Sequence, residues 1–117
     1  MLSAVALTTV VAVVVIRWLL GAQTERGSLR RLPLGPDGVI RGAEAITRRA
    51  DGSRAVLLLH GFGDTAQTLT YLAEHLHRSG FDVHAPLLEG HGRTLAEFGR
   101  GRADAWLQRG VRAYAPI

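Results

Sequence analysis

The chain has 117 residues, enough for one modest domain, and carries a formal net charge of +4 with no cysteine. The lack of cysteine excludes disulfide bonds and thiolate metal sites. Every basic residue is an arginine, the arginines are scattered among acidic residues, and only seven aromatic residues are available for stacking (two Trp, two Tyr and three Phe). This composition argues against a nucleic-acid-binding protein.

An apolar segment opens the chain. Residues 2–20 are apolar apart from four side chains, Ser3, Thr8, Thr9 and Arg17. A membrane-spanning helix needs about 20 residues, so the sequence predicts a single-pass transmembrane anchor over residues 1–22. Arg17 lies near the end of this segment, where its side chain can reach the lipid headgroups, and Trp18 suits the membrane interface.

Two alternatives for this segment stay open. A cleaved signal peptide normally starts with basic residues, and none precedes Leu2. A buried helix of a soluble protein is disfavoured because valine-rich runs of this length rarely lie in globular cores. Basic residues follow the apolar run and none precedes it, so the positive-inside rule places the rest of the chain in the cytoplasm.

Residues 23–38 contain several glycines and prolines and show no lasting periodicity. Such a stretch predicts a linker, with a domain boundary near Gly38 and an α/β domain over residues 39–117.

The rest of the chain is organised around an apolar run that ends at His60. The run predicts a strand over residues 55–60, buried on both faces, with a tight glycine turn after it. A shorter strand over residues 43–49 precedes it across an Asp51–Gly52 turn, which predicts an antiparallel hairpin. Asp64 or Thr65 is expected to cap the helix that follows the glycine turn.

That helix is predicted over residues 66–79, since four of its apolar residues recur on one face, namely Leu69, Leu72, Ala73 and Leu76. Gly80 is expected to end it. A strand over residues 82–85 follows, and strand, helix and strand in this order predict a right-handed parallel crossover.

A loop follows this second strand over residues 87–94. Thr94 and Glu97 predict a capping box for a short helix. A last helix over residues 103–114 would present Trp106 and other apolar residues to the sheet, and Pro116 would close it.

Two kinds of protein use a strand, a glycine turn and a helix in this order. One is a dinucleotide-binding protein, because Gly-Phe-Gly-Asp-Thr-Ala over residues 61–66 fits the G-x-G-x-x-A pattern. That reading needs an acidic residue at the end of the second strand, whereas Asp82 lies at its start. The dinucleotide alternative therefore rests on a single short motif.

The second kind is the α/β-hydrolase fold. Leu-His-Gly-Phe-Gly-Asp-Thr over residues 59–65 resembles the oxyanion loop of bacterial carboxylesterases and monoacylglycerol-lipase-like hydrolases, the serine aminopeptidase group. Gly-His-Gly-Arg-Thr over residues 90–94 resembles a G-x-G-x-S loop that follows one strand later in that group, with threonine replacing serine. The resemblance covers residues 44–114. It implies an α/β fold, a partial α/β-hydrolase sheet after one N-terminal transmembrane helix.

The resemblance also implies roles for residues. The amide of Phe62 would donate to the oxyanion and its ring would line the acyl pocket. The other residues would shape the two loops: His60, Gly61, Gly63 and Asp64 in the first, and Gly90, His91, Gly92 and Thr94 in the second. His60 and His91 would brace their loops rather than act as bases, and no metal or cofactor is implied.

The nucleophile motif G-x-S-x-G of this fold is absent, since none of the four serines has that context, and neither the acid nor the base is present. We therefore expect the N-terminal part of a membrane-anchored serine hydrolase, as a fragment, a truncated reading frame or a decayed gene, inactive alone. Completed, it would act on a small ester or lipid substrate. The alternative is a non-catalytic membrane-tethered module that binds a small anion or a partner through residues 61–65.

Overall fold

The computed structural model describes residues 4–51 and 53–114. Three predictions therefore lie partly or wholly outside the described residues: the first residues of the apolar run, the Asp51–Gly52 turn and the closing role of Pro116. The chain divides after Leu32 into two compact units, and each is described by itself.

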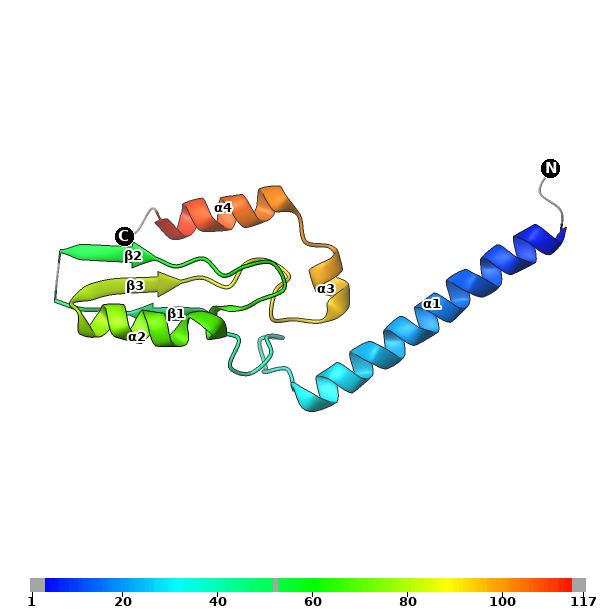
Figure 1. The fold of residues 1–117 in the computed structure, drawn as a ribbon, viewed down its shortest axis with the longest axis horizontal. Helices are drawn as coiled ribbons and strands as arrows, with labels where there is room; N and C mark the ends of the chain where they lie inside the picture. Colours follow the sequence, from blue (N-terminus) through cyan, green and yellow to red (C-terminus); the bar gives the residue numbers. More distant parts are fainter. Residues whose placement is uncertain (1–3, 52, 115–117) are drawn as a thin grey trace. The chain divides into compact units, whose positions relative to one another are not determined.

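The first unit consists of one helix, α1 (Ala4–Arg31), 28 residues long (Figure 1). Its length and composition fit a membrane span, as they would also fit a signal sequence. The helix continues beyond residue 22, into the segment predicted to be a linker. Residues 23–31 include glutamine, glutamate and arginine, which have high helix propensity, and this propensity outweighs the single glycine among them.

The second unit contains a three-stranded sheet of β1 (Ile46–Arg48), β2 (Arg54–Leu57) and β3 (Phe81–Ala85). The strand order is β1-β3-β2, so β3 is central (Figure 1). β2 and β3 are parallel, as the predicted crossover requires, and β1 is antiparallel to β3. The carboxyl ends of β2 and β3 therefore lie at the same end of the sheet.

The predicted antiparallel hairpin between residues 43–49 and 55–60 is wrong, because β3 lies between the two strands. β3 has the most buried side chains of the three, with Val83 and Ala85 almost fully covered, and a central strand is the place for them. Asp82 near the start of β3 accepts hydrogen bonds from the Ala50 amide at 2.6 Å and from Arg49 at 3.1 Å. These bonds fix Arg49 and Ala50 beside the start of β3. The following strand, β2, pairs with β3 and not with β1.

The crossover between β2 and β3 begins with a 3₁₀ turn, η1 (Ala66–Leu69), and continues as α2 (Thr70–Arg78). A helix lies where one was predicted, and Gly80 follows its end with φ +83°. The predicted side-chain cap is wrong, because Thr65 occupies the N-cap without a capping hydrogen bond. Here the Thr65 carbonyl instead accepts from the amide and the hydroxyl of Thr68, which closes a 3₁₀ turn.

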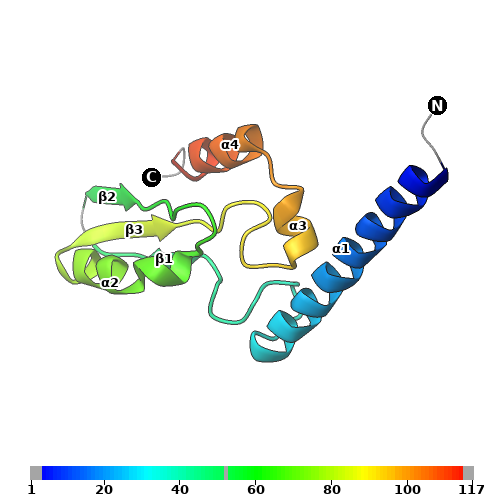
Figure 2. The same cartoon turned by 45° about the vertical axis from the view of Figure 1, so that its right-hand side comes forward.

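Two helices follow β3: α3 (Leu95–Gly99) and α4 (Ala103–Tyr114). The predicted capping box of α3 is confirmed, since Glu97 N–H donates to Thr94 Oγ1 and Thr94 N–H donates to the Glu97 carboxylate, both at 3.2 Å. The last helix has the predicted bounds. In Figures 1 and 2, α2 runs alongside β1 and β3, and α4 lies beyond β2.

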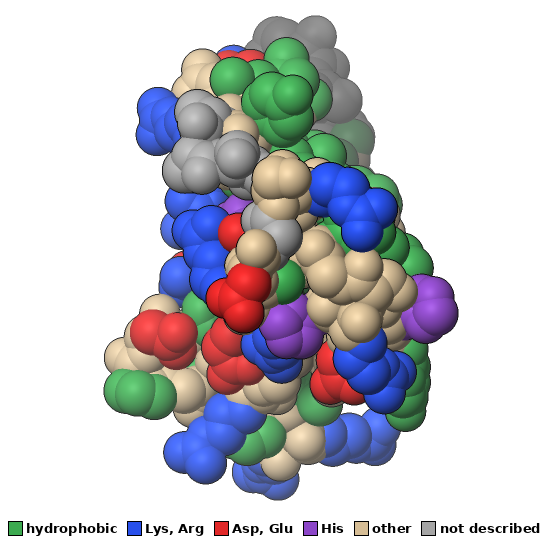
Figure 3. Space-filling view, turned by 90° about the vertical axis from the view of Figure 1, so that its left-hand side faces the viewer, with side chains coloured by type: hydrophobic (Ala, Val, Ile, Leu, Met, Phe, Trp, Pro, Cys, Tyr) green, Lys and Arg blue, Asp and Glu red, His purple; other side chains and the backbone are tan. Residues whose placement is uncertain are grey.

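The core of the second unit is built from small residues. Apart from Pro86, the buried apolar side chains among the described residues are alanine or valine: Val39, Ala43, Ala66, Ala73, Val83, Ala85 and Ala113. Larger apolar side chains near β2 and α4 stay exposed, Leu107 at 70% and Tyr114 at 70%. They line an apolar groove of about 290 Å³ with Leu57 and Leu59. Figure 3 shows one face of the molecule, on which acidic and basic side chains are intermixed.

Candidate functional site at the ends of β2 and β3

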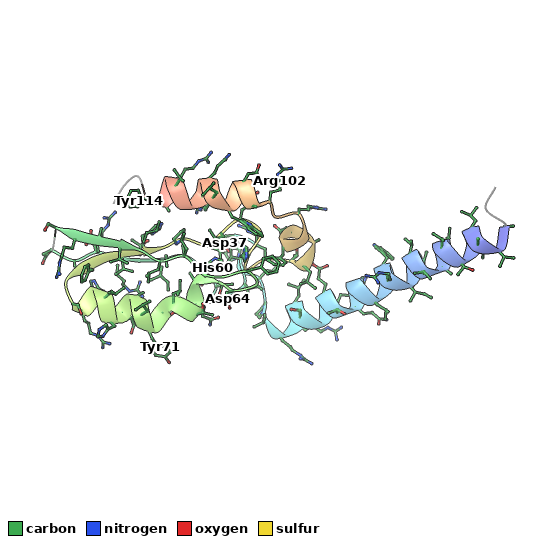
Figure 4. All side chains as sticks on the ribbon, turned by 45° about the horizontal axis from the view of Figure 1, so that its top comes forward. Asp37, His60, Asp64, Tyr71, Arg102 and Tyr114 are labelled. Carbon is green, nitrogen blue, oxygen red and sulfur yellow. The ribbon has the colours of Figure 1, made fainter. Side chains whose placement is uncertain are left out.

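The first loop, residues 60–65, follows β2 and begins with a buried histidine. His60 is 5% exposed and lies at the end of the sheet nearest α3 (Figure 4). Its Nε2 accepts a hydrogen bond from the Leu88 amide at 3.0 Å, and its Nδ1 lies 3.1 Å from the Gly61 carbonyl oxygen. Because the amide can only donate, Nε2 must be unprotonated, so Nδ1 carries the proton and donates to Gly61. This neutral imidazole joins the loop after β2 to the loop after β3.

Electrostatics favour the neutral form of His60. Burial lowers the pKa of His60 below its ordinary value, and the neighbouring His91 lowers it further. The Gly61 carbonyl and the Asp64 carboxylate act in the opposite direction, more weakly than burial does. A protonated His60 could no longer accept from Leu88, so the hydrogen bond between the loops requires the neutral imidazole that burial favours.

The second loop, residues 90–94, contains a second buried histidine. His91 is 2% exposed, and its ring centroid lies 4.9 Å from that of His60. The ring also packs edge-on against Phe98 of α3 at 4.9 Å and Trp106 of α4 at 5.1 Å. His91 Nδ1 lies 3.2 Å from the Glu89 carbonyl, while Nε2 has no hydrogen-bond partner within the described residues.

Phe62 occupies the exposed side of the first loop. Its side chain is 77% exposed, yet its ring centroid lies 5.1 Å from that of Phe98 and 5.8 Å from that of Trp106. Trp106 is itself fixed by donation from Nε1 to the Glu89 carbonyl at 2.9 Å. Within the part of the chain that the structure describes, the Phe62 amide donates no hydrogen bond.

We call this group of five rings the aromatic cluster: His60, Phe62, His91, Phe98 and Trp106. Sequence reasoning identified three of them. It missed the contacts of Phe98 and Trp106 with Phe62, because residues more than thirty positions apart meet only through the fold. The one signal was the apolar face of the last helix, which does not say which loop it meets.

The remaining predicted residues shape the loops through their backbone. The Asp64 amide donates to the Gly61 carbonyl at 3.2 Å and closes the first turn. The Gly92 carbonyl accepts from the Ile40 amide at 2.7 Å, so part of the segment before β1 supports the second loop. Thr94 ends that loop as the N-cap of α3.

Gly63 and Gly90 both adopt left-handed backbone, with φ +77° at each. A Cβ atom at Gly63 would meet nothing within 4 Å, whereas at Gly90 it would lie 2.8 Å from the Glu97 carbonyl oxygen. Gly63 is therefore needed for its conformation alone. Gly90 is needed also because α3 passes directly over it.

The described residues do not place an acidic side chain where a dinucleotide site needs it. β3 ends at Ala85, and Asp82 lies at its opposite end, where Ala50 and Arg49 occupy the carboxylate. No group of three or more His, Asp or Glu residues with the spacing for a metal ion occurs in the described ranges.

Comparison with known proteins identifies relatives of this arrangement. A family model described as serine aminopeptidase, S33, matches residues 50–111, which include both loops. The chain is 35% identical over 63 residues to a carboxylesterase of Bacillus subtilis (strain 168), covering 54% of this chain and 26% of that protein. It is 35% identical over 69 residues to a thermostable monoacylglycerol lipase of Bacillus sp. (strain H-257), covering 59% of this chain and 27% of the lipase.

A solved structure described with LipS and LipT, two metagenome-derived lipolytic enzymes, superposes with a TM-score of 0.62 at 37% identity. The match covers 64% of this chain and 30% of that chain. The present chain therefore spans about a quarter of the length of the curated relatives that it matches.

The two left-handed glycines give a matched pair of substitutions. We expect Gly63→Ala to lower the free energy of unfolding by about 1–2 kcal/mol, the cost of left-handed backbone for alanine. Gly90→Ala should cost about 3 kcal/mol or more, because the Glu97 backbone must also move. Urea unfolding of both variants measures the difference, and equal losses would contradict the close approach of α3 to Gly90.

The lowered pKa of His60 predicts acid sensitivity. The unfolded chain binds a proton at His60 more readily than the folded chain, so the stabilisation is present above about pH 6.5, the ordinary pKa of histidine, and declines as the pH falls below it. His60→Gln keeps an acceptor for Leu88 but cannot titrate, and we expect a shallower decline of the urea midpoint. Some decline should remain, because burial also lowers the pKa of His84. An unchanged slope would show that His60 is not responsible.

Proposed function

Because the chain belongs to the serine aminopeptidase S33 family of α/β-hydrolases, we propose that it forms the N-terminal part of an enzyme that hydrolyses carboxylic esters. In this proposal the first loop is the oxyanion loop and the Phe62 amide is one of its donors. The observation that carries the proposal is that this amide has no hydrogen-bond partner among the described residues, although it lies in a loop that is fixed on both sides.

The fixed loop matters because an oxyanion donor must be positioned before the reaction. A donor that is already oriented stabilises the negative oxygen of the tetrahedral intermediate without reorganisation cost. The His60 hydrogen bond to Leu88 holds the start of the loop, and the Asp64 amide closes its turn. Phe98 and Trp106 contact the ring of Phe62, and in our proposal that ring borders the acyl group of the substrate.

The catalytic serine, acid and base would come from sequence outside this chain. The exposed apolar groove beside β2 supports this part of the proposal, because Leu107, Val111 and Tyr114 are unusually exposed for residues of a finished core. β2 also pairs only with β3 in the described sheet, so its other edge is available to a further strand.

We further propose that α1 anchors this hydrolase in a membrane as a single-pass helix, with the second unit on the cytoplasmic side. The length and composition of the helix support an anchor, and the arginines near its C-terminal end support the orientation. An anchor would hold the site close to lipid-like esters.

The test of the oxyanion role uses a completed enzyme, in which the downstream portion of the Bacillus subtilis carboxylesterase is joined to this chain. We expect hydrolysis of short-acyl esters. Phe62→Pro removes the amide donor and should lower kcat by about 10²–10³, the usual cost of one oxyanion donor. The matched control Phe62→Ala keeps the amide and should act mainly on KM.

A completed enzyme that is folded but inactive toward esters would contradict the proposed activity and favour a non-catalytic module. Equal losses of kcat in Phe62→Pro and Phe62→Ala would assign the effect to the ring and remove the amide from the mechanism.

A further inference from the structure

The C-terminal part of α1 carries three arginines that the proposed anchor uses only for its orientation. Arg26, Arg30 and Arg31 lie beyond the apolar run, on a helix that continues without a break to Arg31. All three are exposed, and none forms an ion pair in the described part of the chain. We call these residues the arginine collar.

The helix provides no internal partner for this charge. Its one acidic residue is Glu25, and the positions three and four residues after it are Ser28 and Leu29. Side chains interact along a helix at these spacings, so Glu25 forms no i,i+3 or i,i+4 ion pair with the three arginines, and the segment keeps a net positive charge. Arg26 and Arg30 share one face because they are four residues apart, and Arg31 extends the positive charge around the helix.

The continuous helix also sets the height of the collar. At a rise of about 1.5 Å per residue, Arg26 lies about 9 Å and Arg31 about 16 Å beyond Leu20, the end of the apolar run. The headgroup layer is about 5–8 Å thick on each side of the hydrocarbon core. Helical side chains tilt toward the N-terminus, which here means back toward the headgroups. All three charges then lie within about one screening length, 8–10 Å, of the lipid surface.

We propose that the arginine collar binds the headgroups of anionic phospholipids in the leaflet from which α1 emerges. This inference rests on the proposed membrane anchor and adds a lipid specificity to it. The chemistry is that of a juxtamembrane basic segment on an anionic surface: each arginine near the surface should shift the ratio of docked to undocked helix about fivefold at physiological salt. The collar would fix the segment that leads from α1 into the second unit.

The test uses the whole chain and a single label. Because the chain has no cysteine, Ser28→Cys places one fluorescent probe between Arg26 and Arg30. The protein is reconstituted into vesicles of phosphatidylcholine alone or with phosphatidylglycerol, and quenching by an aqueous quencher is measured. We expect phosphatidylglycerol to slow quenching severalfold, and added salt to reverse the effect.

Two triple variants separate the collar from overall charge. Arg26→Gln, Arg30→Gln and Arg31→Gln together should abolish the dependence on phosphatidylglycerol. The control removes three exposed arginines of the second unit, Arg78→Gln, Arg100→Gln and Arg112→Gln, and should retain it. Equal quenching in both vesicle types, or equal effects of the two triple variants, would overturn the proposal that the arginine collar binds anionic phospholipids.

Extraction with alkaline carbonate distinguishes the failure of the collar from the failure of the anchor. If the chain resists extraction but shows no dependence on phosphatidylglycerol, the proposed anchor stands and the proposed lipid binding by the arginine collar is wrong. If the chain is extracted completely, both proposals are wrong.

Discussion

The hydrogen bond from the Leu88 amide to Nε2 of His60 is the interaction on which the candidate site depends. It joins the loop after β2 to the loop after β3, two segments 28 residues apart in sequence. The bond requires a neutral imidazole, which burial favours by lowering the pKa of His60. His91 then packs against the same ring and brings α3 and α4 onto the loops through Phe98 and Trp106. The position of Phe62 follows from these contacts.

The sequence predicted those parts of the fold that local rules determine. The capping box of Thr94 and Glu97, the helix over residues 103–114 and the parallel crossover all depend on neighbouring residues or on chain direction. The hairpin was wrong because strand order depends on burial across the whole sheet, and Val83 makes β3 the central strand. The glycines and prolines of residues 23–38 predict a linker, but α1 continues through residues 23–31 because glutamine, glutamate and arginine favour the helix more than the single glycine among them disfavours it.

In the candidate site, too, the sequence predicted the features that local residues determine and missed the contacts that depend on the whole fold. Both candidate loops could be located from short motifs, and the residues that the family model matches include them. The partners of His60 and Phe62 could not, since a bond to a backbone amide leaves no signal in side-chain chemistry. The small core of alanine and valine and the exposed apolar groove beside β2 also needed the structure. The chain spans about a quarter of the length of the curated relatives that it matches, and our proposal therefore takes the nucleophile from outside it.

Amide hydrogen exchange, followed residue by residue by NMR, tests the central claim most directly. If His60 fixes the first loop and leaves the Phe62 amide without an internal acceptor, the Leu88 amide will exchange slowly and the Phe62 amide close to the rate of an unstructured peptide. Protection of the Phe62 amide equal to that of Leu88, in a chain that is folded, would contradict the account.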